Sequence, residues 1–140
     1  MSKKVEIQET ISGFMNSFDL KDWGRMKEVL ADSLFVDYSD LREEEAGEIS
    51  ADDYIGKRIA LHDKLRLHHL ITNFEGVVGG RSASVLASCV IYRNSGLQSF
   101  NTHALYEFGL ILDDGEKWKI SRIKQVVLWN EGDLKIDWQY

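Results

Sequence analysis

The order of local patterns in this 140-residue chain predicts an α+β fold, in which helices come first and antiparallel strands follow. Up to about residue 62, apolar residues recur at helical spacing. After that point, runs of β-branched and aromatic residues alternate with short Gly, Asn and Asp turns, as in antiparallel hairpins. Because 140 residues suffice for one hydrophobic core, we expect a single domain over residues 1–140.

The helical half divides at its polar residues. A first helix should bury one apolar stripe, formed by Ile7, Ile11, Phe14, Met15 and Phe18. Asp19 or Asp22 can cap a second helix that begins near Trp23. A short strand over Leu34–Tyr38 should follow.

An acidic segment at residues 42–45 is expected to be a solvated loop. Ser50 and Asp53 resemble a capping box, which predicts a third helix with Ile55 and Ile59 turned inward. Four strands are then predicted over residues 65–74, 83–93, 98–112 and 117–129. A strongly curved sheet wrapped around helices leaves a pocket where a small ligand can bind.

Composition limits the function classes. The net charge of −6 argues against nucleic acid or an anionic membrane as a partner, since both bind basic surfaces. No apolar run approaches the roughly 20 residues of a membrane span, and no signal peptide is visible. The single Cys89 excludes an internal disulfide and fits a reducing compartment, so we expect a cytoplasmic protein.

A carboxylate near a helix end and a histidine on a strand can form a proton-transfer dyad without a cofactor. Asp19 and the pair His68–His69 are the candidates, and strand alternation places the two histidines on opposite faces. Asp19 could equally cap a helix, a role that stabilises the fold by roughly 1 kcal/mol. Tyr38 could stabilise an enolate or simply anchor the end of a strand.

Other chemistries have less support. His103 and Asn101 share one face of a strand and could line the pocket. No histidine or cysteine spacing matches a zinc pattern, so we expect no metal, and no nucleophile motif is present.

Four segments in register resemble the scytalone dehydratase family: Asp19–Trp23, Val36–Tyr38, His69–Ile71, and Trp118–Ile120 followed by Trp129-x-Glu131. That family lies within the nuclear transport factor 2-like (SnoaL-like) superfamily, and the resemblance spans about Ile11 to Trp138. It implies a cone-shaped, curved antiparallel sheet wrapped around the N-terminal helices. It also implies that His69 faces the cone, with Asp19 as its dyad partner. The hexachlorocyclohexane dehydrochlorinases, more distant members of the fold group, have a similar Asp–His layout.

The resemblance implies a cofactor-free lyase that acts on a small cyclic, polyketide-like or aromatic-precursor carbonyl compound. His69 would remove a proton, oriented by Asp19, and Tyr38 would stabilise the enolate. Phe18 and Asn73, which shares a strand face with His69, would contact the hydrophobic ligand. An isomerase or cyclase, or a non-catalytic ligand-binding domain, are the alternatives on the same scaffold. A homo-oligomer is expected, with a trimer favoured over a dimer.

Two positions depart from the family pattern and bear on the substrate, as does the C-terminal tail. Phe18 stands where the family has a tyrosine, and Tyr92, Arg93 or Asn94 stands near the family's second histidine. The proton-abstracting half of the site is therefore retained, and a different substrate is expected. In the family the C-terminal segment closes over the pocket, and Leu134 and Trp138 fall near the positions that contact ligand. An ordinary docked terminus or a subunit contact is the alternative.

Overall fold

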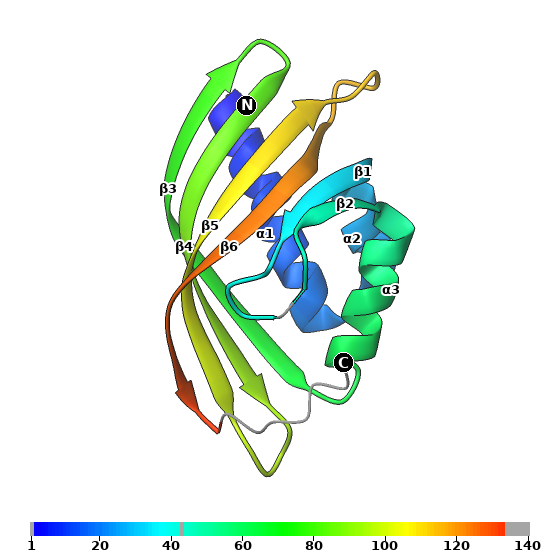
Figure 1. Ribbon diagram of the computed structural model, residues 1–140. Helices are drawn as coiled ribbons and strands as arrows, with labels where there is room; N and C mark the ends of the chain where they lie inside the picture. Colours follow the sequence, from blue (N-terminus) through cyan, green and yellow to red (C-terminus); the bar gives the residue numbers. More distant parts are fainter. Residues whose placement is uncertain (1, 43, 134–140) are drawn as a thin grey trace.

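The computed structural model describes residues 2–42 and 44–133 and confirms the predicted α+β class. The elements are α1 (Lys3–Leu20), α2 (Trp23–Val29), β1 (Leu30–Asp37), β2 (Gly47–Ser50), α3 (Ala51–His62), β3 (Arg66–Gly79), β4 (Ser82–Asn94), β5 (Phe100–Leu112) and β6 (Trp118–Gly132). The strands form one sheet in the order β2-β1-β6-β5-β4-β3. Figure 1 shows the long strands β3 to β6 as a strongly curved layer, with the helices gathered on its concave side.

Each helix begins at a side-chain cap. The Ser2 hydroxyl accepts from the Val5 amide, Asp22 accepts from the Arg25 amide, and the Ser50 hydroxyl accepts from the Asp53 amide. Of the two candidate caps of α2, Asp22 is therefore the one used, which leaves the Asp19 carboxylate available for other contacts. α1 ends at Leu20 and is capped by Lys21, whose left-handed backbone (φ 53°) lets its amide donate to carbonyls of the last turn.

The sheet is antiparallel except where β1 runs parallel to β6. The expectation of antiparallel strands holds for β3 to β6, which follow one another through short turns. The β1–β6 pair joins segments far apart in the sequence, so no local turn chemistry could predict it. The short strand β2, which pairs antiparallel with β1, was also not predicted.

A bulge interrupts β3 and corrects the placement of Asn73. The pairing with β4 skips between Thr72 and Glu75, and Asn73 has a left-handed backbone (φ 57°). Because the extra residue shifts the alternation, Asn73 is exposed and Phe74 turns toward the helices. The prediction that Asn73 contacts ligand beside His69 is therefore wrong.

Aromatic contacts fix the helices against the concave face. Phe14 of α1 lies 5.1 Å from Phe18, 6.2 Å from Tyr54 of α3 and 6.3 Å from Phe108 of β5, measured between ring centroids. Such edge-on and tilted pairs add to the burial of the rings themselves. No helix in the described ranges is long and apolar enough to cross a membrane.

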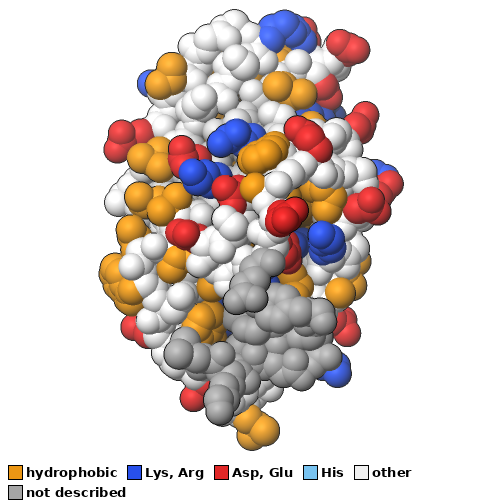
Figure 2. Space-filling model, viewed as in Figure 1, with side chains coloured by type: hydrophobic (Ala, Val, Ile, Leu, Met, Phe, Trp, Pro, Cys, Tyr) orange, Lys and Arg blue, Asp and Glu red, His pale blue; other side chains and the backbone are white. Residues whose placement is uncertain are grey.

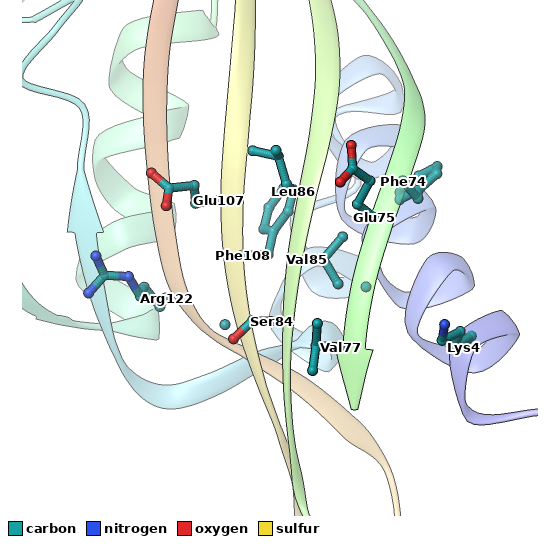
Figure 3. A pocket seen from close by; sticks show the side chains of 12 residues that line it. Lys4, Phe74, Glu75, Val77, Ser84, Val85, Leu86, Glu107, Phe108 and Arg122 are labelled. Atoms are coloured by element: carbon teal, nitrogen blue, oxygen red, sulfur yellow. The ribbon is translucent and has the colours of Figure 1, made fainter. Parts of the chain in front are cut away.

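A wide depression of about 630 Å³ is lined by residues of β3 to β6 and by Lys4 of α1 (Figure 3). A cross-strand row runs through it from Glu75 to Leu86 and Glu107, and the Glu107 carboxylate lies 3.9 Å from the Lys124 ammonium. None of its lining residues lines the cavity beside His69. The expected homo-oligomer stays a prediction.

Candidate active site

Asp19 and His69 are in direct contact. The His69 Nδ1 atom lies 2.7 Å from Asp19 Oδ1, and the His69 backbone amide donates to Asp19 Oδ2 at 2.9 Å. Asp19 is the next-to-last residue of α1, and His69 lies on β3, against which α1 packs. The carboxylate thus fixes both the main chain and the ring of one residue, and the contact expected of a dyad is present.

This contact assigns the ring tautomer. An ionised carboxylate can only accept hydrogen bonds, so Nδ1 of His69 must carry the proton that it donates to Asp19. The neutral ring then has its lone pair on Nε2, the nitrogen that Asp19 does not contact. Nε2 is the atom available to take a proton from a ligand.

His69 is buried in an aromatic environment. Its side chain is 6% exposed and stacks on Phe18, with ring centroids 4.9 Å apart. Burial lowers the pKa of His69 below its ordinary value of 6.5, and Asp19 opposes that shift. The ring is therefore neutral at pH 7, as a general base must be.

Tyr38 follows β1 and is buried on the same cavity. Its hydroxyl lies 2.7 Å from the hydroxyl of Tyr54 on α3. Burial raises the pKa of Tyr38, while the nearby Arg58 guanidinium opposes the rise. Tyr38 is thus a neutral phenol that can donate a hydrogen bond.

The cavity beside His69 is lined by side chains from α1, α3 and β3 to β6, and from the segment that follows β1. It is lined by Phe18, Tyr38, Arg42, Arg58, His62, His69, Ile91, Arg93, Tyr106 and Gln125. Its volume of about 20 Å³ suffices for one water molecule. A larger ligand therefore requires some of these side chains to move.

Two of the expected pocket residues lie elsewhere. On β5, Thr102 and Tyr106 are buried toward the helices, so the alternation sends Asn101 and His103 to the convex face. His103 stacks on Trp129 at 4.2 Å, and its Nε2 lies 3.1 Å from a Glu131 carboxylate oxygen. The prediction that Asn101 and His103 line the pocket is wrong, because the sequence did not say which face was concave.

Besides Ile91, six polar lining residues were not proposed as site residues from the sequence, although Arg93 was noted near the family's second histidine: Arg42, Arg58, His62, Arg93, Tyr106 and Gln125. A pattern could have revealed three of them. Arg58 and His62 fall on the buried stripe of α3 with Tyr54, and Arg93 falls on the buried alternation of β4 with Ile91. Charged or polar residues in apolar registers mark a functional interior.

The same stripe corrects the prediction for Ile59, whose side chain was expected to turn inward but is 38% exposed.

The two predicted tail residues, Leu134 and Trp138, lie outside the described residues. Burial raises the pKa of the Cys89 thiol to about 12, which disfavours the reactive thiolate. The described ranges contain no group of three or more His, Cys, Asp or Glu side chains placed to hold a metal ion.

His62 makes stability depend on pH. Burial, followed by the charges of Arg42, Arg58 and Arg93, holds the pKa of His62 well below 6.5. The folded ring stays neutral, whereas the unfolded ring takes up a proton below pH 6.5, so this stabilisation is complete above pH 6.5 and is lost as the pH falls. Lowering the pH from 6.5 to about 5 should cost roughly 2 kcal/mol in the free energy of unfolding.

Urea unfolding of the protein and of His62→Gln at both pH values measures this loss. The variant should lose about 2 kcal/mol less than the parent chain over the same interval. His68→Gln, which alters an exposed ring on the next strand, is the matched control and should keep the parent slope. Equal slopes for all three proteins would contradict a neutral, buried His62.

Comparison with known proteins identifies the family. The model of the SnoaL-like domain matches residues 1–124. The chain belongs to the SnoaL-like domain family. This SnoaL-like chain is 30% identical over 134 residues to the scytalone dehydratase-like protein Arp1 of Metarhizium majus, a match that covers 84% of the chain and 76% of that protein. The expected resemblance is therefore confirmed.

A second relative, the scytalone dehydratase-like protein claB of Passalora fulva, is 34% identical over 58 residues, which span 41% of the chain and only 36% of claB. Two solved structures share the fold. An NTF2-like protein from Cytophaga hutchinsonii superposes with a TM-score of 0.75 at 13% identity, over 91% of the SnoaL-like chain and all of that protein. The hexachlorocyclohexane dehydrochlorinase LinA-type3 from Novosphingobium barchaimii gives 0.73 at 18% identity, with 95% and 91% coverage.

Proposed function

We propose that this SnoaL-like protein is a cofactor-free lyase, which eliminates water or a similar group from a small carbonyl compound through an enolate. The observation that carries the proposal is the 2.7 Å contact between Asp19 and the Nδ1 atom of His69, which leaves Nε2 as a base in a buried cavity. The names of the relatives, which are scytalone dehydratase-like proteins, favour the same reaction class.

In the first step, Nε2 of His69 takes the proton α to the carbonyl. The electrons of the broken C–H bond form the enolate, whose oxygen accepts a hydrogen bond from the Tyr38 hydroxyl. The imidazolium that results is held by the Asp19 carboxylate. Burial of both groups strengthens these interactions, because little water competes for them.

In the second step, the enolate electrons form a carbon–carbon double bond as the neighbouring C–O bond breaks. The departing hydroxide takes the proton from His69 and leaves as water, so the imidazole is again neutral and all atoms balance. Phe18 brings no hydroxyl to this step, which leaves His69 as the acid as well as the base.

Hydrogen exchange with solvent tests the proposal on a panel of candidate substrates. Cyclic β-hydroxy ketones and aromatic-precursor carbonyl compounds are each incubated with the protein in D₂O and followed by mass spectrometry. A lyase gives loss of one water, and reversible proton abstraction adds deuterium to the α-carbon of the substrate that has not yet reacted. Exchange without loss of mass would identify an isomerase or cyclase, and absence of both across the panel would favour a binding domain.

Tyr38→Phe tests the enolate step. Because the variant removes only the hydroxyl that stabilises the developing charge, we expect turnover to fall by roughly 10² while the fold is retained. Steady-state kinetics on an active panel compound measure the effect. Tyr54→Phe, which removes the partner hydroxyl at 2.7 Å, is the matched control and should cost far less. Equal losses in the two variants would contradict a direct role for Tyr38.

A further inference from the structure

The interior of this acidic protein carries positive charge. The chain has a net charge of −6, and acidic and basic side chains are interspersed over the face shown in Figure 2. Yet three of the residues that line the cavity beside His69 are arginines, and none of those lining residues is a carboxylate. Arg42, Arg58 and Arg93 are only 4%, 2% and 2% exposed. Burying charge is costly unless it is paired, so the pairing of each guanidinium group decides how it can act.

The contacts of Arg58 leave part of its hydrogen-bonding capacity unfilled among the described residues. Its guanidinium lies between the rings of Tyr38 and Tyr54, 4.9 and 4.8 Å from their centroids. Its ion pair with Glu44 has a nitrogen–oxygen distance of 3.8 Å, which is longer than a hydrogen bond. The buried Nε atom finds no hydrogen-bond partner among the described residues. The planar guanidinium thus lies beside Tyr38 with its Nε donor unpaired among those residues and its Nη2 atom in a long ion pair with Glu44.

Two other polar atoms of the cavity are also buried without a hydrogen-bond partner among the described residues. His62 Nδ1 and Gln125 Oε1 are buried, line the same cavity and have no hydrogen-bond partner within the ranges described. The amide nitrogen of Gln125 is used, since it donates to the Tyr106 hydroxyl at 2.9 Å. Buried polar atoms are normally satisfied, so unsatisfied atoms that share one cavity point to a polar ligand there.

We propose that the cavity binds its substrate through a carboxylate that pairs with the Arg58 guanidinium, so that the substrate class is carbonyl acids and not neutral phenols. This inference rests on the proposed lyase function and narrows its substrate. The surrounding arginines offset both the bound carboxylate and the enolate that forms beside it.

The placement of the groups supports productive binding. Arg58 contacts the Tyr38 ring, and Tyr38 lines the same cavity as His69. A carboxylate on the Arg58 fork therefore brings the adjoining carbonyl toward the Tyr38 hydroxyl and its α-carbon toward Nε2 of His69. Because a guanidinium fork matches a carboxylate in shape, it would fix orientation as well as charge. Phe18 and Ile91 supply apolar surface for the rest of a ring-containing ligand.

Matched neutral and anionic probes test this inference. Benzoate and benzamide have nearly the same shape and differ in charge, and their binding is measured by isothermal titration calorimetry at constant ionic strength and pH 7. We expect benzoate to bind about 10- to 100-fold more tightly than benzamide, as for a charge-assisted pair. Arg58→Met should bring benzoate down to the affinity of benzamide. Arg66→Met, which removes an exposed arginine on the convex face of β3, should preserve the preference.

If Arg58→Met does not fold, Arg58→Lys keeps the charge and removes the fork, and it should still weaken benzoate binding at least several-fold. Equal affinities for the two probes, failure of both to bind, or unchanged benzoate affinity in the Arg58 variants would overturn the inference. Benzoate titration and the substrate panel, both carried out on the parent protein, separate the two proposals. Benzoate binding without any elimination activity would leave the anion site standing and remove the lyase. Elimination from neutral ketones without benzoate binding would do the reverse.

Discussion

His69→Ala is expected to lower turnover by about 10²–10⁴, because the base that takes the α-proton in the proposed reaction is lost. The Michaelis constant should change little, since the aromatic and arginine contacts of the cavity remain. The measurement is the steady-state rate on a compound that the parent protein dehydrates in the exchange panel. Deuterium uptake at the α-carbon should disappear together with dehydration.

His68→Ala provides the matched control for this prediction. It removes the neighbouring imidazole from the same strand, but His68 points to the convex face and is exposed. Its rate should stay within a few-fold of the parent rate, and circular dichroism should show both variants folded. If His69→Ala retains the parent rate, the residue does not act as the base and the mechanism is wrong.

Asp19→Asn should have the second-largest effect, a loss of roughly 10²–10⁴ in kcat. An asparagine offers one acceptor oxygen where the carboxylate accepts from both the amide and the Nδ1 atom of His69. When the amide NH₂ group faces Nδ1, the ring adopts the other tautomer and the lone pair leaves Nε2. The imidazolium also loses its counter-charge.

The pH profile distinguishes this role from a purely structural one. The pKa of His69 lies below 6.5, so kcat/KM of the parent should be flat above that value and fall as the pH drops. Asp19 raises the pKa of His69 against the effect of burial, so its loss should move the acid limb to still lower pH. Asp32→Asn, at an exposed position of β1, should leave both rate and profile unchanged. A lower rate with an unshifted acid limb would mean that Asp19 only holds the fold.

Local patterns determined most of the secondary structure. Ser50 caps α3, and Asp22, one of two candidates, caps α2, because a side-chain oxygen near its own helix amides is a local event. The turns at residues 94–96 and 113–115 likewise set the β4–β5 and β5–β6 hairpins without help from distant residues. The predicted pair of Asp19 and His69 also meets, although its catalytic role stays a prediction.

Tertiary structure decided what faces the cavity. Period-2 alternation sorts Asn101 and His103 from Thr102 and Tyr106, but only the packing of the helices on one face makes that face concave. The bulge at Asn73 reversed the alternation within β3, and no residue pattern announced it. Arg58 and His62 lie on α3 and Arg93 lies on β4, yet all three line one cavity. Their proximity depends on contacts between segments distant in the chain, such as those that curve the sheet and pair β1 with β6. Sequence spacing determines which residues share a face of a strand. Whether that face looks toward the cavity or away from it is decided by the whole fold.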